Sequence, residues 1–132
     1  MDPRTQMYLH MLERRLEGEC QSAQMRVRRA TTMAEVVRAT GISVPPELRA
    51  LRNNYPSYRQ LKNAAERKLE ELLDEQLKAL KDGTLEQARQ LFAGYQHREW
   101  QSLRGTYATL YRRGEIEARR ILHGRSGENP AT

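Results

Sequence analysis

Cysteine is almost absent from this sequence, since Cys20 is the only one. A single cysteine excludes an intramolecular disulfide and a thiolate-rich metal site. The three histidines, His10, His97 and His123, lie far apart and have no metal-binding partner three or four positions away. We therefore expect no metal and no cofactor, and we expect Cys20 to behave as a small buried hydrophobic residue.

Long apolar segments and catalytic motifs are missing as well. No N-terminal stretch resembles a signal peptide or a membrane span, so we expect a cytoplasmic protein without a membrane partner; a phage virion would suit the same sequence. No serine stands in a nucleophile elbow. The carboxylates of Glu115 and Glu117 lie among arginines, which indicates solvated ion pairs and not acid–base catalysis. No loop is rich enough in glycine to hold a phosphate. The sequence therefore predicts a protein that is not an enzyme.

Aromatic residues are also scarce: the 132 residues include one Trp, one Phe and six Tyr. Hydrophobic residues make up 38% and charged residues 30%, a balance typical of narrow apolar stripes on long, solvated helices. No run alternates polar and apolar residues with β-branched side chains, so we expect no sheet. The predicted fold class is all-α.

Apolar residues recur three, four or seven positions apart over residues 4–40, where glycine and proline are nearly absent. This coiled-coil-like spacing predicts one long helix that ends at Gly41, with Thr31–Thr32 as a candidate break because a threonine can cap a new helix. The predicted inward stripe comprises Leu9, Leu12, Leu16, Ala23, Val27, Ala30, Ala34 and Val37, with Glu19/Cys20 at the missing step.

Residues 32–52, TMAEVVRATGISVPPELRALR, resemble two short helices joined at Gly41. They pose a choice between a DNA-reading helix-turn-helix and a corner between bundle helices. Pro45–Pro46 stand at the entry of the would-be recognition helix, and Glu47 occupies a position that is usually apolar. We therefore favour a short helical corner near residues 42–55, in which Val44 and Leu48 are packing residues.

Two further long helices are predicted, over residues 56–81 and 85–122. KDGT at residues 81–84 predicts a tight helical hairpin, because Gly83 can end one helix and Thr84 can cap the next in a capping box with Gln87. The last helix is expected to face inward through Leu85, Ala88, Phe92, Tyr95, Leu103, Tyr107, Leu110 and Ile121. Three long helices predict an elongated bundle, with a single domain over residues 1–123 and a flexible C-terminal tail over residues 124–132.

The net charge is +6, and 19 of the 23 basic residues are arginine. Residues 1–41, 42–83 and 84–132 carry +2, +1 and +3. Clustered arginines grip nucleic-acid phosphates without reading sequence, although those near a helix C-terminus also stabilise the helix dipole. Trp100, Tyr107 and Tyr111 lie beside the last helix's stripe, where aromatic residues either stack on bases or seal the core. The predicted nucleic-acid-binding residues are Arg26, Arg28, Arg29, Arg112, Arg113, Arg119 and Arg120.

A second surface is predicted from methionines and glycines opposite the apolar stripes. Met7, Met11, Gly18 and Met25 lie on this outer face of the first helix, and Gly94 and Gly105 are expected to align on the last helix, three turns apart. We predict that Met7, Met11, Met25, Gly94 and Gly105 contact a protein partner or a second copy of the chain. Two functions are therefore carried forward: a non-catalytic assembly subunit that contacts nucleic-acid backbone, and an adaptor or inhibitor that docks on a larger protein.

Overall fold

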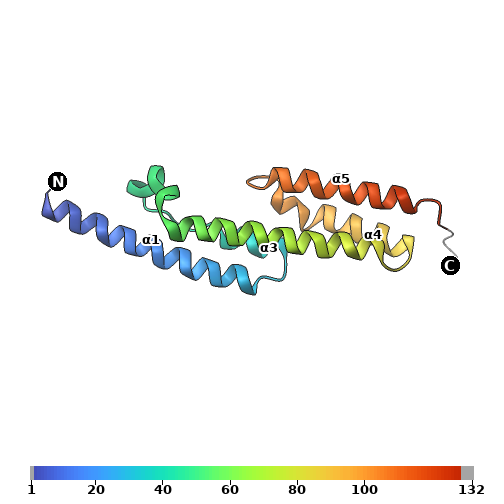
Figure 1. Ribbon diagram of the computed structural model, residues 1–132, viewed down its shortest axis with the longest axis horizontal. Coiled ribbons are helices and arrows are strands. Elements are labelled where there is room, and N and C mark those ends of the chain that lie inside the picture. The colour runs from blue at the N-terminus through green and yellow to red at the C-terminus, as the bar shows by residue number, and fades with distance from the viewer. Residues whose placement is uncertain (1, 129–132) are drawn as a thin grey trace. The chain divides into compact units, whose positions relative to one another are not determined.

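All the regular structure in the computed structural model, which describes residues 2–128, is helical (Figure 1). The elements, in order, are α1 (Pro3–Arg29), α2 (Met33–Ala39), the 3₁₀ helix η1 (Pro46–Asn54), α3 (Pro56–Lys81), α4 (Leu85–His97), the 3₁₀ helix η2 (Trp100–Leu103) and α5 (Ala108–Arg125). The predicted all-α bundle is confirmed. Over the described residues, no helix is long and apolar enough to cross a membrane.

The contacts within the chain form two compact units. Unit 1 comprises Met1–Ala30 and Glu35–Lys68, and unit 2 comprises Thr31–Ala34 and Leu69–Thr132. The division falls within α3, after Lys68. The single domain predicted over residues 1–123 stays a prediction, and each unit has its own architecture.

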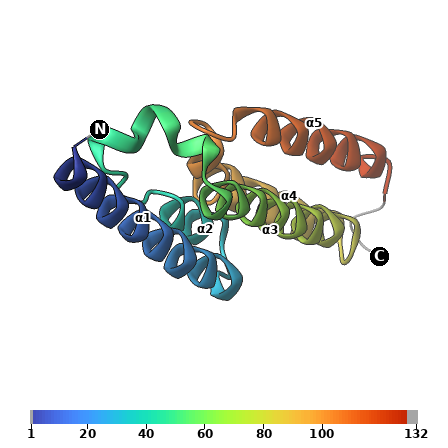
Figure 2. The same ribbon diagram turned by 60° about the vertical axis from the view of Figure 1, so that its left-hand side comes forward.

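Unit 1 is built on α1 and the first half of α3, which run side by side in the same direction (Figures 1 and 2). Asp2 caps α1 by accepting a hydrogen bond from the backbone N–H of Arg4 at 3.3 Å, and Pro3 supplies the fixed φ that suits a first turn. The Gln24 amide donates to the carbonyl of Ser57 at 3.3 Å. The buried residues of α1 recur at the predicted spacing: Leu12, Leu16, Cys20, Ala23 and Val27.

The helix predicted over residues 4–40 breaks at the candidate site. Ala30 is extended, with φ −65° and ψ 138°, and α2 begins anew at Met33. A restarted helix does not keep the rotational phase of the one before it. The buried residues of α2 are consequently Met33, Val36 and Ala39, whereas the predicted Ala34 and Val37 are half-buried. The predicted stripe is therefore buried from Leu12 to Ala30, whereas its outer members Leu9, Ala34 and Val37 are half-buried.

The segment after α2 forms the predicted corner. Its helical part, η1, follows Pro45 and is a 3₁₀ helix, so it lacks the α-helix that a helix-turn-helix inserts into a groove. The predicted packing residue Leu48 is 2% exposed and Val44 is half-buried. A hydrogen bond of 3.4 Å from the Tyr8 hydroxyl to Glu47 joins this corner to α1.

Unit 2 is built from the second half of α3 together with α4 and α5. The predicted hairpin between α3 and α4 is confirmed, because Gly83 adopts a φ of +70° that suits glycine. Thr84 and Gln87 form the predicted capping box: Gln87 N–H donates to Thr84 Oγ1 at 3.2 Å, and Thr84 N–H donates to Gln87 Oε1 at 3.0 Å.

The single helix predicted over residues 85–122 is wrong. The chain leaves α4 after His97, forms η2, turns at residues 104–107 and returns as α5 antiparallel to α4 (Figure 1). Folding back lets both halves pack within unit 2, where a continuous helix would carry its second half away from the first. Gly114 permits this close packing, because a Cβ there would lie 2.8 Å from Leu73 Cδ1. Gly94 lies in α4 and Gly105 in the turn, so the two glycines do not align as predicted.

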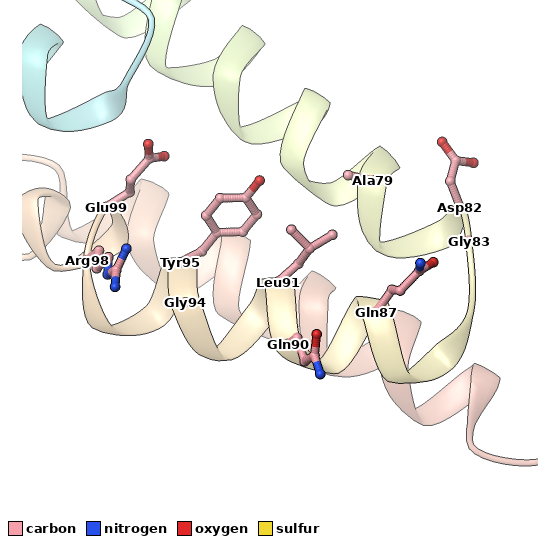
Figure 3. A pocket seen from close by; sticks show the side chains of 10 residues that line it. All are labelled: Ala79, Asp82, Gly83, Gln87, Gln90, Leu91, Gly94, Tyr95, Arg98 and Glu99. Atoms are coloured by element: carbon pink, nitrogen blue, oxygen red, sulfur yellow. The ribbon is translucent and has the colours of Figure 1, made fainter. Parts of the chain in front are cut away.

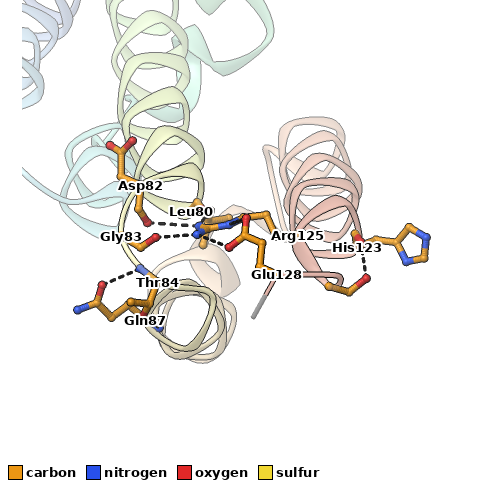
Figure 4. A network of polar contacts seen from close by, with 9 residues as sticks. Leu80, Asp82, Gly83, Thr84, Gln87, His123, Arg125 and Glu128 are labelled. Atoms are coloured by element: carbon orange, nitrogen blue, oxygen red, sulfur yellow. Dashed lines mark hydrogen bonds and ion pairs between the residues drawn. The ribbon is translucent and has the colours of Figure 1, made fainter. Parts of the chain in front are cut away.

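α5 continues to Arg125, two residues beyond the predicted end of the bundle. The Arg125 guanidinium donates to the carbonyls of Leu80 and Gly83, both at 2.6 Å, and of Asp82 at 3.3 Å (Figure 4). It also pairs with Glu128 at 2.8 Å. One side chain thus ties the end of α5 to the α3–α4 turn. Of the predicted flexible tail, residues 129–132 lie outside the described residues.

Candidate nucleic-acid interface

The first predicted arginine group, Arg26, Arg28 and Arg29, lies in the last turn of α1 and is exposed. Positions two apart on a helix point in nearly opposite directions, whereas positions three apart share a face. Arg26 and Arg29 accordingly line one hollow of about 450 Å³, and Arg28 is not among its lining residues. The structure therefore brings two of the three side chains together.

Arg38 of α2 completes this group, although sequence reasoning missed it. The hollow is lined by Arg26, Arg29 and Arg38, with Glu35 and the buried Ala30 and Ala39. We call Arg26, Arg29 and Arg38 the unit 1 arginine group. The candidate break at Thr31–Thr32 could have identified Arg38. If the chain turns at this break, α2 folds back and an exposed arginine on it lies close to the end of α1. Three guanidinium groups against one carboxylate leave an excess of positive charge around an open hollow, which favours a phosphate.

The net charge of the chain falls wholly within unit 1. Unit 1 has thirteen Lys and Arg against seven Asp and Glu, whereas unit 2 has ten of each. Several unit 1 cations contact neutral groups: Arg26 donates to Ser22 Oγ at 2.9 Å, and Arg52 and Lys62 each lie 5.9 Å from the centre of the Tyr58 ring. These contacts leave the positive charge uncompensated. When net charge is counted over consecutive thirds of the sequence, the C-terminal third is the most basic. That count does not reveal that the net charge lies in unit 1, because unit 1 is made of two separate segments.

The second predicted group, on α5, is largely neutralised. Arg119 pairs with Glu115 and Arg120 with Glu117, each at 3.0 Å, and Arg113 lies 3.8 Å from Asp74 of α3. Arg119 also lies 5.8 Å from the centre of the Phe92 ring. Arg112 is exposed and, over residues 2–128, takes part in no ion pair. The carboxylates compete with a phosphate for three of the four arginines, so this group favours nucleic acid less than the unit 1 arginine group does.

A hollow of about 720 Å³ lies in unit 2 between the end of α3 and α4 (Figure 3). Leu91 and Tyr95 project into it from α4, facing Ala79 of α3, and Arg98 and Glu99 stand at one end. Burial, and secondarily the charge of Glu99, raises the pKa of the Tyr95 phenol. The hollow provides an apolar floor and polar ends, without a nucleophile beside a base.

Trp100 belongs to the core and not to a base-stacking surface. Its side chain is 1% exposed, and its indole N–H donates to Gln76 Oε1 at 2.5 Å. The Gln76 amide in turn donates to Glu99. Phe92 packs edge-on against the indole at 5.7 Å between ring centroids, and Tyr95 stacks on it at 6.4 Å. Of the two interpretations of these aromatics, sealing of the core is therefore confirmed for Trp100.

The predicted partner-contact residues are all exposed. Met7, Met11 and Met25 are 69%, 66% and 51% exposed on α1. Gly94, which lines the unit 2 hollow, and Gly105 each face open space, because a Cβ built there would meet nothing within 4 Å. Their contact with a partner stays a prediction. Comparisons of the chain with protein-family models, with curated proteins and with solved structures found no match.

Proposed function

We propose that this protein is a non-catalytic helical subunit that binds nucleic-acid backbone through unit 1, without reading base sequence. The observation that carries the proposal is the separation of charge: the whole net charge of +6 belongs to unit 1, where the unit 1 arginine group surrounds an open hollow. Such a surface attracts phosphates by releasing counterions, a mechanism that requires no base contact.

The lining of the unit 1 hollow and the ion pairs of α5 reduce the set of predicted binding residues. Arg26 and Arg29 are retained and Arg38 is added, while Arg113, Arg119 and Arg120 serve as ion-pair partners within unit 2. In the segment that resembled a helix-turn-helix, the second helix is a 3₁₀ helix, so no α-helix stands at the position that reads the major groove.

The test compares two triple variants that remove the same charge. The first is Arg26→Gln/Arg29→Gln/Arg38→Gln in unit 1, and the matched control is Arg112→Gln/Arg119→Gln/Arg120→Gln on α5. Binding of labelled single-stranded DNA, duplex DNA and RNA is measured by fluorescence anisotropy over a range of salt concentrations, and circular dichroism verifies the helix content of each variant.

We expect the unit 1 variant to weaken binding more than the α5 variant. Removing one arginine–phosphate pair reduces the slope of log K against log salt by roughly 0.7 for single strands and 0.9 for duplex DNA, so removing all three should reduce it by about 2 to 3. Equal weakening by both variants would show that net charge alone drives association. Absence of binding at low salt would refute the proposal and leave the protein-docking adaptor as the better function.

A further inference from the structure

The outer face of α1 is an exposed surface of distinctive chemistry. Met7, Met11, Gly18 and Met25 are spaced by four, seven and seven residues, which places them along one side of the helix. All four are exposed, the methionines by half or more. We call these four residues the outer stripe. The positions three or four residues away from them hold arginine, histidine or uncharged residues and no carboxylate: Pro3, Arg4, Tyr8, His10, Arg14, Arg15, Gln21, Ser22, Arg28 and Arg29.

The first three turns of α1 lie largely outside the core of unit 1. The first buried residue is Leu12, and before it only Leu9 is half-buried among the described residues. Met7, Tyr8 and Met11 are therefore carried on a helix end that unit 1 leaves mostly in solvent. Exposed apolar side chains gathered on one helix face are typical of a surface that another helix covers.

Gly18 marks the centre of the outer stripe. It stands seven residues after Met11 and seven residues before Met25. A Cβ at Gly18 would meet nothing within 4 Å, so packing inside the chain does not require glycine there. Glycine in mid-helix costs roughly 1 kcal/mol relative to alanine. A second helix crossing at this point would gain from the missing side chain, because its backbone can approach closely.

The spacing about Gly18 makes the outer stripe self-complementary in one direction only. When two copies of α1 run antiparallel about a two-fold axis at Gly18, Met11 of each copy lies opposite Met25 of the other. Arg14 then lies opposite Ser22 and Arg15 opposite Gln21, so no arginine faces an arginine. The same register brings Arg15 within one helical turn of Glu19 of the second copy. A parallel pair would instead place each of these arginines against its own counterpart, which repels.

We propose that α1 mediates an antiparallel homodimer through the outer stripe, with Gly18 at the crossing point. The occupant of this face is a second copy of the chain, chosen by the charge pattern: the antiparallel register opposes each arginine of the face with an uncharged residue and offers Arg15 a carboxylate. The projecting first turns of one α1 are then covered by the second half of the other. The dimer forms without nucleic acid, so the two proposals can fail separately, although they share Arg29: the register places this member of the unit 1 arginine group opposite Met7 of the second copy.

Cross-linking tests the register. In a Cys20→Ala background, single cysteines are introduced by Gly18→Cys, Met11→Cys, Met25→Cys and, as a control on α5, Ile116→Cys; Ile116 is 59% exposed. We expect oxidation to join Gly18→Cys to itself, and to join Met11→Cys to Met25→Cys when the two are mixed. Met25→Cys alone and Ile116→Cys should form no disulfide-linked dimer.

Sedimentation velocity tests the association itself. The unmodified chain should dimerise as its concentration rises. Met11→Lys should weaken the association by about tenfold or more, a loss of roughly 1.4 kcal/mol or more, since it replaces an apolar contact with another positive charge. The matched control Ile116→Lys should leave it unchanged. A chain that stays monomeric at every concentration, self-linking of Met25→Cys, or equal weakening by both lysine variants would each overturn the proposal.

Discussion

The hydrogen bond between Trp100 and Gln76 offers a quantitative test of the unit 2 core. Gln76→Leu keeps the approximate volume of a side chain that is 9% exposed, but removes the acceptor of the indole N–H. A buried donor left without an acceptor costs about 1–3 kcal/mol. Trp100→Phe leaves the opposite defect, because Gln76 Oε1 loses its donor, and the smaller ring adds a cavity cost of about 1 kcal/mol or more.

The double variant separates the hydrogen bond from these other effects. Gln76→Leu/Trp100→Phe leaves neither partner unsatisfied, so it should be less destabilised than the sum of the single variants by about 1–2 kcal/mol. Gln76→Leu also removes the hydrogen bond from Gln76 to Glu99, both in the single and in the double variant. The loss of that bond therefore cancels when the double variant is compared with the sum of the two single variants.

Urea unfolding followed by circular dichroism measures all the variants, including those that lack the single tryptophan. Gln90→Leu, at an exposed glutamine of α4, serves as the matched control and should change the free energy of unfolding by no more than about 0.5 kcal/mol. Additive single effects, within about 0.5 kcal/mol, would refute the reasoning that the two side chains satisfy each other.

Three further outcomes are expected. Gly114→Ala should lower the free energy of unfolding by about 1–2 kcal/mol, because crowding against a leucine methyl group exceeds the gain in helix propensity, whereas Gly94→Ala should raise it by up to about 1 kcal/mol; chemical denaturation measures both. Arg125→Ala should lower the melting temperature, and this effect should shrink at acidic pH. The hydrogen bond from Arg125 lowers the pKa of Glu128 in the folded protein. The stabilisation from this pair is therefore present above the ordinary glutamate pKa and is lost as the pH falls through the lowered pKa of Glu128. Burial, and secondarily Glu19, raises the pKa of the Cys20 thiol, so alkylation should be slow in the folded protein and fast in urea, as followed by mass spectrometry.

Local signals in the sequence were sufficient for much of the fold. Pro56 begins α3 and the Gly83–Thr84–Gln87 pattern forms the hairpin, because a missing N–H, a positive φ and a capping hydroxyl act within a few residues of where they stand. The apolar spacing of α1 likewise identified the buried face from Leu12 to Ala30.

The candidate interface was predictable only in part. Arg26 and Arg29 were found as members of a charge cluster, but a cluster in sequence does not say which side chains point together or which have partners. Arg38 joins the group only through the turn between α1 and α2, and Arg119 and Arg120 are withdrawn from it by ion pairs one helical turn away.

What the sequence determined by itself is the helical class, the capped α3–α4 hairpin, and the inner and outer faces of α1, since these depend on period and on neighbouring residues. The tertiary structure decided the fold-back after His97 and the concentration of net charge in unit 1. Both depend on which distant segments pack together: Trp100 finds its acceptor on α3, 24 residues earlier in the chain, and no local pattern around residues 97–107 encodes that pairing.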